Sequence, residues 1–377
     1  MELPRIRREH APYRTPTGAV RIGGGIPGLA AEIPDHTGWR WTLLTQLDGT
    51  RTTAQICAAV RAAHPDRTDE QILRLLADLA ANGRLDDAAA TPPAEFTAAE
   101  LVRYGRAVEL WSWTDPTDRP AWDVQLALRR AAVTVLGTGG AGSHAALLLA
   151  AAGVGRLHLV DHDTVEESNL GRQILFTADD IGHPKAQRAA ARLRAQNPHV
   201  AITAQAEQVT SQTRIAELMA DTDILVLCAD EPAGLRQAAN RASIATGRPW
   251  VDGGYTGPVI STALYRPGHH GGPCWQCLRT GEAGAHDLGV TDPADAIKAL
   301  PKAIGHPVSA VTAALSGTYA AHAAISHLTG TTPLTPGTVH IHNLLTPGRT
   351  RTITHPRDPA CPACAAPIPA TASGGDQ

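Results

Sequence analysis

The chain has 377 residues, of which 43% are hydrophobic, and its formal net charge is −3. This length is enough for two or three domains with buried cores, and the small negative charge argues against nucleic acid as the main partner. No targeting segment or membrane-spanning apolar run stands out in the sequence, so we expect a cytoplasmic protein that binds neither nucleic acid nor membrane.

Residues 1–90 are predicted to form a first module, a small winged helix. Its expected elements are strands over 18–23 and 29–33, a helix over 39–47, a helix capped by Thr52 or Thr53, a helix capped by Asp69 and ending at Gly83, and a wing strand over 84–87. Winged helices often bind DNA, but the helix after Asp69 mixes acidic and basic side chains and has no basic stripe. DNA is therefore disfavoured as its ligand.

The run Leu-Asp-Gly-Thr-Arg-Thr at 47–52, together with this order of elements, resembles the PqqD-like recognition modules of peptide-modifying enzymes. The resemblance implies that the module binds a precursor peptide, which adds a strand to an exposed sheet edge. A domain that only stabilises the fold is the other interpretation. A linker over 91–100, which contains Pro92 and Pro93, separates the module from the next domain.

The second predicted domain, residues 101–367, begins with a helix and then a nucleotide-binding pattern. Strands are expected over 133–136 and 156–160, with a helix over 143–152 between them. The turn from Gly137 to Gly142, which includes Gly139, lets backbone N–H groups meet a phosphate at a helix N-terminus. Asp161 follows the second strand, where a carboxylate can hold ribose hydroxyls. This much fits any dinucleotide-binding enzyme.

The next residues favour a triphosphate over a dinucleotide. Asp163 is followed by Asn169, Arg172 and Gln173, and then by Lys185. A pyrophosphate can be satisfied by backbone amides, whereas a triphosphate carries more charge and calls for cationic side chains. The chain has only three lysines, so the use of lysine at 185 is itself informative.

This motif string resembles the ThiF/MoeB/HesA family of ATP-dependent adenylating enzymes, the bacterial relatives of ubiquitin-activating enzymes. The resemblance covers roughly residues 101–367 and implies a Rossmann-like α/β domain with a mostly parallel sheet that binds ATP and Mg²⁺. By position, the residues implied are Gly137, Gly139 and Gly142 for the nucleotide turn, Asp161 for ribose, and Asn169, Arg172, Gln173 and Lys185 for phosphate and adenine. Asp163 is expected to help with the metal or with the loop.

Two further matches lie outside that string. Asp230 follows an apolar run from residue 224, at the position where the family binds magnesium, although Glu231-Pro232 replaces the family's usual Asn after it. The segment from Arg103 to Arg106 resembles the Arg-Tyr-x-Arg segment of the family, which implies that Arg106 reaches the triphosphate of the neighbouring subunit in a homodimer. Arg172, Lys185, Asp230 and Arg106 are thus the expected catalytic residues.

Four of the six cysteines form two CxxC pairs, Cys274 with Cys277 and Cys361 with Cys364. Two such knuckles can complete the four-thiolate shell of a structural Zn²⁺. A pair of disulfides is the alternative, which a reducing compartment disfavours. The other two, Cys57 and Cys228, are expected to be small core residues.

The substrate is predicted from three features. The segment over 278–306, where relatives that pass their product to a cysteine place it, has no Cys. Residues 229–232 and 252–255 resemble the peptide-adenylating branch of the family, typified by the microcin C adenylyltransferase. Gly253 and Gly254 are expected near the substrate carboxylate, or else in a tight turn without a ligand.

We therefore expect an adenylyltransferase that activates a carboxylate, most simply that of a ribosomally made precursor peptide in natural-product biosynthesis. The alternatives are adenylation of a ubiquitin-like sulfur-carrier protein that ends in Gly-Gly, and a peptide-docking subunit without activity. Residues 368–377 are expected to be a disordered tail.

Overall fold

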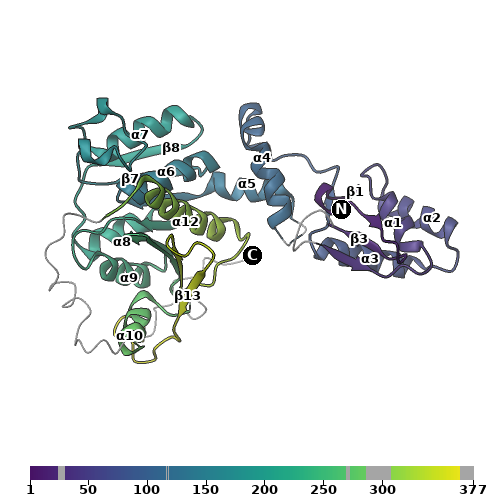
Figure 1. The fold of residues 1–377 in the computed structure, drawn as a ribbon. Helices are drawn as coiled ribbons and strands as arrows, with labels where there is room; N and C mark the ends of the chain where they lie inside the picture. Colours follow the sequence, from purple (N-terminus) through teal and green to yellow (C-terminus); the bar gives the residue numbers. More distant parts are fainter. Residues whose placement is uncertain (24–29, 116, 118, 269–271, 286–306, 366–377) are drawn as a thin grey trace. The chain divides into compact units, whose positions relative to one another are not determined.

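The computed structural model describes residues 1–23, 30–115, 117, 119–268, 272–285 and 307–365. The chain divides into two compact units (Figure 1), the first formed by residues 1–126 and 330–332 and the second by residues 127–329 and 333–377. The predicted tail, and most of the segment in which an acceptor cysteine was sought, lie outside the described residues. The domain limits at residues 90 and 100 stay predictions.

The first unit has a two-stranded and a three-stranded sheet, with strand orders β1-β5 and β2-β3-β4. Its elements are β1 (Pro4–Ile6), η1 (Arg8–His10), β2 (Tyr13–Arg14), β3 (Val20–Ile22), β4 (Ala31–Ile33), α1 (Trp39–Gln46), α2 (Thr53–Ala63), α3 (Asp69–Ala81), β5 (Leu85–Asp87) and α4 (Ala98–Thr114). The order of elements expected for the first module is thus present. Its core is apolar and includes Val20, Ile22, Leu43, Ile56, Ile72 and Leu85.

One predicted cap is wrong by a single residue. Thr68, not Asp69, is the N-cap of α3, because its hydroxyl accepts a hydrogen bond from the Gln71 amide at 3.3 Å while the Gln71 side chain accepts one from the Thr68 amide at 3.2 Å. Such a reciprocal capping box satisfies two amides that the helix leaves unpaired. Asp69 instead forms an ion pair with Arg61 at 3.0 Å.

The second unit is built on an eight-stranded sheet with the order β13-β12-β11-β10-β9-β6-β7-β8. Neighbours from β10 through β9, β6 and β7 to β8 are parallel, and β10 to β13 are antiparallel. The strands are β6 (Ala132–Leu136), β7 (Arg156–Val160), β8 (Ala201–Gln205), β9 (Ile224–Leu227), β10 (Trp250–Thr256), β11 (Val259–Tyr265), β12 (Thr338–Asn343) and β13 (Thr350–Thr354). The helices are α5 (Ala121–Arg130), which crosses from the first unit, α6 (Gly140–Ala152), η2 (Glu167–Asn169), η3 (Ala178–Asp180), α7 (Lys185–Gln196), α8 (Gln212–Ala220), α9 (Leu235–Thr246), α10 (Trp275–Ala285) and α12 (Ala310–Thr329).

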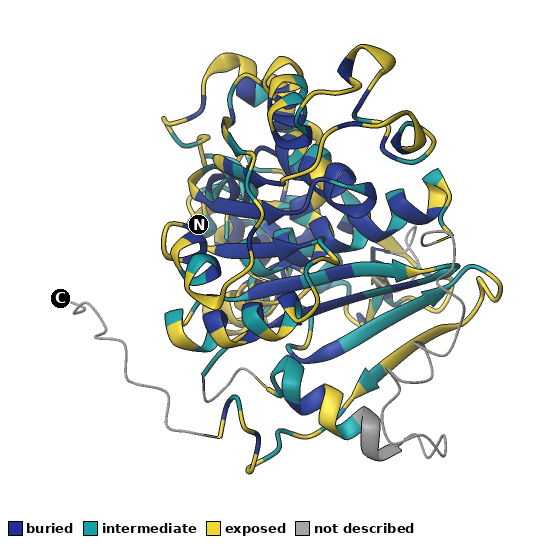
Figure 2. Cartoon of the chain, turned by 90° about the vertical axis from the view of Figure 1, so that its left-hand side faces the viewer, coloured by how far each residue is buried: buried dark blue, intermediate teal, exposed yellow. Residues whose placement is uncertain are grey.

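Burial along this sheet follows from its composition. Every residue of β6 and of β9 is buried, as expected for parallel strands covered on both faces. Figure 2 shows these buried strands in the middle of the sheet, whereas β13 at one edge is mostly exposed. The predicted α/β class with a mostly parallel sheet is therefore confirmed. Within the described residues, no helix is both long and apolar enough to cross a membrane.

The strand order also locates a crevice. From β6 the chain runs to β7 and β8 on one side, and it continues through β9 and β10 on the other side. In open α/β sheets, ligands bind at such a switch point, outside the carboxyl ends of the strands. The residues that follow β6 and β9, namely Gly137 and Cys228, lie at this point.

Candidate functional site

A cavity of about 780 Å³ opens at this switch point. Its lining combines the glycine turn after β6, acidic residues after β7 and β9, and two cations from more distant segments. Of the predicted site residues it contains Gly137, Gly139, Asp161, Asp163, Arg172, Gln173, Lys185 and Asp230. Gly142 and Asn169 do not line it.

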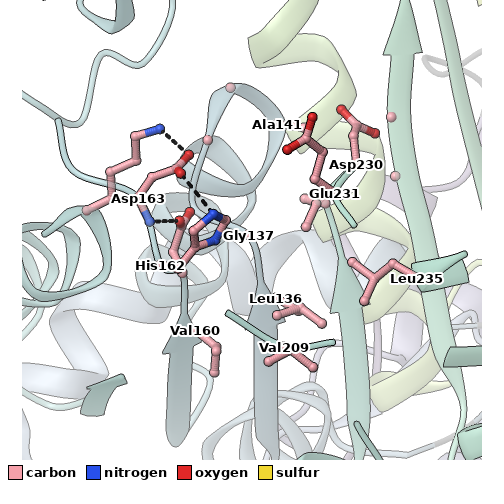
Figure 3. Close-up of a pocket in the computed structure, with 18 of the residues that line it drawn as sticks. Leu136, Gly137, Ala141, Val160, His162, Asp163, Val209, Asp230, Glu231 and Leu235 are labelled. Carbon is pink, nitrogen blue, oxygen red and sulfur yellow. Dashed lines mark hydrogen bonds and ion pairs between the residues drawn. The ribbon is translucent and has the colours of Figure 1, made fainter. Parts of the chain in front are cut away.

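The inner part of the cavity is apolar. Leu136, Val160, Val209 and Leu235 lie together below the charged groups in Figure 3. Asp163 and His162 lie on one side, above Val160, and Asp230 and Glu231 lie on the other side. The apolar floor suits a flat heterocycle, and the carboxylates of the rim suit the cations that accompany a polyanionic tail.

The glycine turn forms as predicted, but α6 begins at Gly140, three residues before the expected start. Gly137 has φ 89°, and a Cβ on it would lie 2.7 Å from the Ala229 nitrogen. A Cβ on Gly142 would overlap the carbonyl oxygen of Gly137, so Gly142 allows the helix to pack against the turn. The N-cap of α6 is Gly139, which has no side chain that could cap the helix. The first amides of α6 therefore have no side-chain cap and are suited to an anion.

Asp161 orders this turn. Its Oδ2 accepts hydrogen bonds from the Thr138 amide and hydroxyl at 2.6 and 2.9 Å, and its Oδ1 accepts one from the Asp163 amide at 2.9 Å. A carboxylate offers about four acceptor positions, so capacity remains for the predicted ribose hydroxyl.

Lys185 meets Asp163 across the cavity rim, with Nζ 2.9 Å from Oδ2. The lysine side chain is 7% exposed and the aspartate side chain is 50% exposed. Lys185 is the first residue of α7, where the helix dipole disfavours a cation. The Asp163 carboxylate offsets that cost, and a triphosphate could compete for the same ammonium group.

Arg172 and Gln173 reach the cavity from the segment after η2. Arg172 Nη1 donates a hydrogen bond to the Ser168 carbonyl at 2.8 Å. Gln173 is buried, and its Oε1 has no hydrogen-bond partner in the structure. A buried acceptor that faces a cavity without a partner is what a ligand donor would satisfy. Asn169 instead holds its own loop, because its Oδ1 accepts a hydrogen bond from the Glu166 amide at 3.1 Å.

Asp230 is held by an arginine that the motifs did not single out. Arg236, on α9, lies 3.1 Å from Asp230 through Nη2 and 2.9 Å from Asp252 through Nε. Burial raises the pKa of the Asp252 carboxyl, and the Arg236 guanidinium opposes that rise. The arginine therefore pairs with two carboxylates, one in the segment after β9 and one inside β10. An arginine six residues after Asp230 is the only sequence signal for this role.

Gly253 and Gly254 both lie inside β10 and line the cavity, so their interpretation as a tight turn is wrong. A Cβ on Gly253 would lie 2.7 Å from the Ala320 Cβ, so the close packing of β10 against α12 requires glycine. Cys228 was expected to be a small core residue, but it is half-buried, follows β9 and lines the cavity, so that expectation is wrong for this cysteine. Burial raises the pKa of its thiol to about 12, which disfavours the thiolate at neutral pH.

The four paired cysteines converge on a second site. Sulfur separations are 3.8 Å for Cys274 and Cys277, 3.7 Å for Cys274 and Cys361, and 3.5 Å for Cys277 and Cys364. These exceed any S–S bond, so the disulfide alternative is wrong. A tetrahedral shell with Zn–S distances of about 2.3 Å places sulfurs roughly 3.8 Å apart. The cluster therefore fits Zn²⁺, with no open position for catalysis.

Arg106 lies on α4, in the first unit. Its side chain is 91% exposed, and Nη1 lies 2.9 Å from a Glu109 carboxylate oxygen. A surface pair of this kind contributes little to stability. The predicted action of Arg106 on a neighbouring subunit stays a prediction.

Comparisons with known proteins agree with this geometry. A sequence model of the ThiF family matches residues 108–363. The sulfur carrier protein adenylyltransferase of Thermus thermophilus is 34% identical over 274 residues, which cover 71% of this chain and 92% of that protein. The adenylyltransferase and sulfurtransferase MOCS3 of Arabidopsis thaliana is 35% identical over 196 residues, 52% of this chain and only 41% of that protein.

Among solved structures, that of E. coli MccB is 21% identical, with a TM-score of 0.78 and 97% of both chains covered. The structure of PaaA is 24% identical, with a TM-score of 0.68, and covers 92% of this chain and 98% of that one. At these identities the likeness shows the fold, over nearly the whole chain.

Proposed function

Because the chain belongs to the ThiF family and its similar relatives are adenylyltransferases, we propose that it adenylates a carboxylate of a ribosomally made precursor peptide and releases pyrophosphate. The single observation that supports this chemistry most is the cavity at the switch point. It brings the free amides of α6, the cations Lys185 and Arg172, and the carboxylate of Asp230 around one apolar floor.

In this reaction the substrate carboxylate attacks the α-phosphorus of ATP in line, and the bond to the pyrophosphate oxygen breaks. Such transfers depend mainly on positioning and charge neutralisation, so they need cations and not a strong base. Lys185 and Arg172 would bind the phosphates, and Asp161 would hold the ribose. Arg106 of a second subunit would add a third cation.

The carboxylates of Asp230 and Glu231 line the cavity and are the hard oxygen ligands that Mg²⁺ prefers. Mg²⁺ held by Asp230 would neutralise charge on the triphosphate. Arg236 orients Asp230 for this role through the contact at 3.1 Å. The negative charge of the triphosphate is also the reason why the pocket needs both Lys185 and Arg172.

A peptide substrate is favoured by the first unit. The family match begins at residue 108, so the strands and helices β1 to α3 lie outside it. The solved structures of E. coli MccB with MccA are similar in fold over 97% of this chain, which takes in most of these elements. In this proposal the first unit binds the precursor peptide along a sheet edge, and the second unit performs the chemistry.

A ubiquitin-like sulfur carrier is the second candidate. It is favoured by the Thermus thermophilus relative, whose 34% identity extends over 92% of its own length. The two substrates can be separated by pyrophosphate exchange. One arm of the experiment would contain a synthetic peptide whose sequence is encoded by a short reading frame beside the gene. The other arm would contain a small protein that ends in Gly-Gly and is encoded by a neighbouring gene.

We expect exchange with the peptide and none with the carrier. Deletion of residues 1–90 should weaken peptide binding in isothermal titration, since strand addition supplies backbone hydrogen bonds worth roughly 0.5–1.5 kcal/mol each. ATP binding by the truncated chain serves as its folding control. Exchange with the carrier alone, or a peptide affinity that is unchanged after deletion of residues 1–90, would favour the sulfur carrier as the substrate.

A further inference from the structure

A further cation lies beside the nucleotide cavity, apart from Lys185 and Arg172. Arg236 is the second residue of α9 and does not itself line the cavity. Its Nη2 lies 3.1 Å from Asp230 Oδ1, and a Cβ built on Gly254 would lie 3.3 Å from the same nitrogen. Asp230 and Gly254 both line the cavity. The guanidinium therefore reaches the cavity wall, between the segment after β9 and strand β10.

Two aspartates occupy one edge of this guanidinium. Asp252 Oδ1 lies 2.9 Å from Nε, and Asp230 Oδ1 lies 3.1 Å from Nη2. A guanidinium has five N–H donors in a fixed planar fork, and its Nε and Nη2 lie on the same edge. Among the described residues, no hydrogen bond or ion pair engages the other edge, formed by Nη1 and the second N–H of Nη2. That open edge matches a carboxylate, which accepts two parallel hydrogen bonds from such a fork.

Glycine at position 254 keeps the guanidinium accessible from β10. Gly254 and Asp252 are two residues apart in this strand, so they lie on the same face of the sheet. A side chain at position 254 would lie against Nη2, because even its first carbon would be 3.3 Å away. The φ of Gly254 lies outside the left-handed region, so the backbone does not require glycine there. Access to the guanidinium is a physical reason for this glycine.

A carboxylate that attacks ATP needs a cation of its own. It approaches the α-phosphorus against the negative charge of the triphosphate, while Lys185 and Arg172 are assigned to the phosphates. Arg236 is already offset by two aspartates, but one of them, Asp230, is the proposed ligand of Mg²⁺. A divalent cation there would neutralise the Asp230 carboxylate, and the guanidinium would keep its charge for a third carboxylate.

We propose that the open edge of Arg236, beside Gly254, binds the carboxylate that the enzyme activates. This inference rests on the proposed function and names the group that holds the reacting end of the substrate. The carboxylate is either the C-terminal one of the peptide or an acidic side chain within it, since both present the same two oxygens. Arg236 transfers no proton, because a guanidinium stays protonated in proteins.

The test measures peptide binding by isothermal titration, with Mg²⁺ and an ATP analogue that cannot be cleaved between its α- and β-phosphates. Three versions of the synthetic peptide are compared: unmodified, with a C-terminal amide, and with its acidic side chains replaced by their amides. One of the two amide versions should bind wild type at least about 10-fold more weakly, the equivalent of one hydrogen bond between charged groups. The version that loses affinity identifies the source of the carboxylate.

Two variants connect this difference to the proposed site. Gly254→Ala and Arg236→Lys should each reduce it to less than about 2-fold, because the first covers the open edge and the second removes the fork. The matched controls are Gly348→Ala and Arg241→Lys. A Cβ on Gly348 would meet open space, Arg241 is exposed on α9, and neither lines the cavity. Both controls should keep the full difference, and circular dichroism checks that all four variants are folded.

Three results would overturn the inference: equal affinities of wild type for the three peptides, no peptide binding by wild type, or a difference that persists in both Gly254→Ala and Arg236→Lys. Pyrophosphate exchange with the unmodified peptide is measured separately. If wild type shows no exchange but its affinity depends on the carboxylate and on both residues, the proposed function fails and Arg236 remains the carboxylate-binding residue.

Discussion

At the scale of single residues, three aspartates of the cavity are each paired with a hydrogen-bond donor. Asp161 accepts two hydrogen bonds from Thr138 of the glycine turn and one from the Asp163 amide, Asp163 pairs with Lys185, and Asp230 shares Arg236 with Asp252. These pairs keep carboxylates beside a polyanion site without uncompensated repulsion. The pairing also holds each group in place before a ligand arrives.

Substitution of Arg236 is the most direct test of the pairing between this arginine and its two aspartates. Arg236→Met should destabilise the fold by about 3 kcal/mol, because it leaves the largely buried Asp252 carboxylate and Asp230 without their cation. Adding Asp252→Asn to that variant should recover part of the loss, since one of the two uncompensated charges disappears. Urea unfolding of the three proteins measures both effects. A double variant less stable than Arg236→Met would refute the pairing.

At the scale of elements, α7 is fixed to the preceding segment by Asp180. This fully buried carboxylate meets Arg188 and Arg192 of α7, the latter at 3.0 Å, and α7 begins with Lys185. Burial alone would raise the pKa of Asp180, but hydrogen bonds from Thr177, Arg188 and Arg192 lower it to about 2. The position of Lys185 in the cavity thus depends on an aspartate outside it.

A pH-dependent loss of stability should follow from Asp180. Because folding lowers this pKa, its contribution is complete above the ordinary value of about 3.8 and is lost as the pH falls through about 2. Asp180→Asn should cost about 2 kcal/mol at neutral pH, and its difference from wild type should shrink between about pH 4 and pH 2. Urea unfolding across that range measures it. A difference independent of pH would show that Asp180 is not the titrating group.

The cysteine cluster joins two distant segments, the start of α10 and residues 361–364. Purified protein should contain one zinc ion per chain, since the cluster fits one four-thiolate shell. Cys361→Ser, or a strong chelator, should lower the zinc content and the Tm together. The reason is that the site forms only in the folded chain, so the free energy of metal binding adds to the free energy of folding. Cys57→Ser, outside the cluster, should leave the metal content intact. Zinc-free protein of unchanged Tm would contradict the assignment.

At the scale of the whole molecule, the predicted homodimer depends on Arg106. If Arg106 acts on the neighbouring subunit, Arg106→Ala and Lys185→Ala chains should each be inactive, and mixing them should restore up to about one-quarter of wild-type activity through heterodimers with one intact site. Subunit exchange must be verified by mass tagging. Exchange without recovered activity would exclude action in trans.

Local patterns predicted much of this molecule. The glycine turn, the strand at 156–160 and the paired cysteines depend on neighbouring residues and regular spacing, so the sequence alone indicated them. Arg236 did not emerge, because its partner Asp252 comes from another element, strand β10. The glycines of β10 were ambiguous for the same reason, since their packing partner, Ala320, lies 67 positions after Gly253.

The central claim is that the cavity at the switch point transfers an adenylyl group. Substrate-dependent ATP–pyrophosphate exchange, measured with wild type and with Arg172→Ala, Lys185→Ala and Asp230→Ala, tests it directly. We predict exchange by wild type and a loss of roughly 100-fold or more in each variant, about 3 kcal/mol of transition-state stabilisation, while circular dichroism shows each variant folded. Wild-type rates in all three variants, or no exchange with any peptide or carrier, would contradict it.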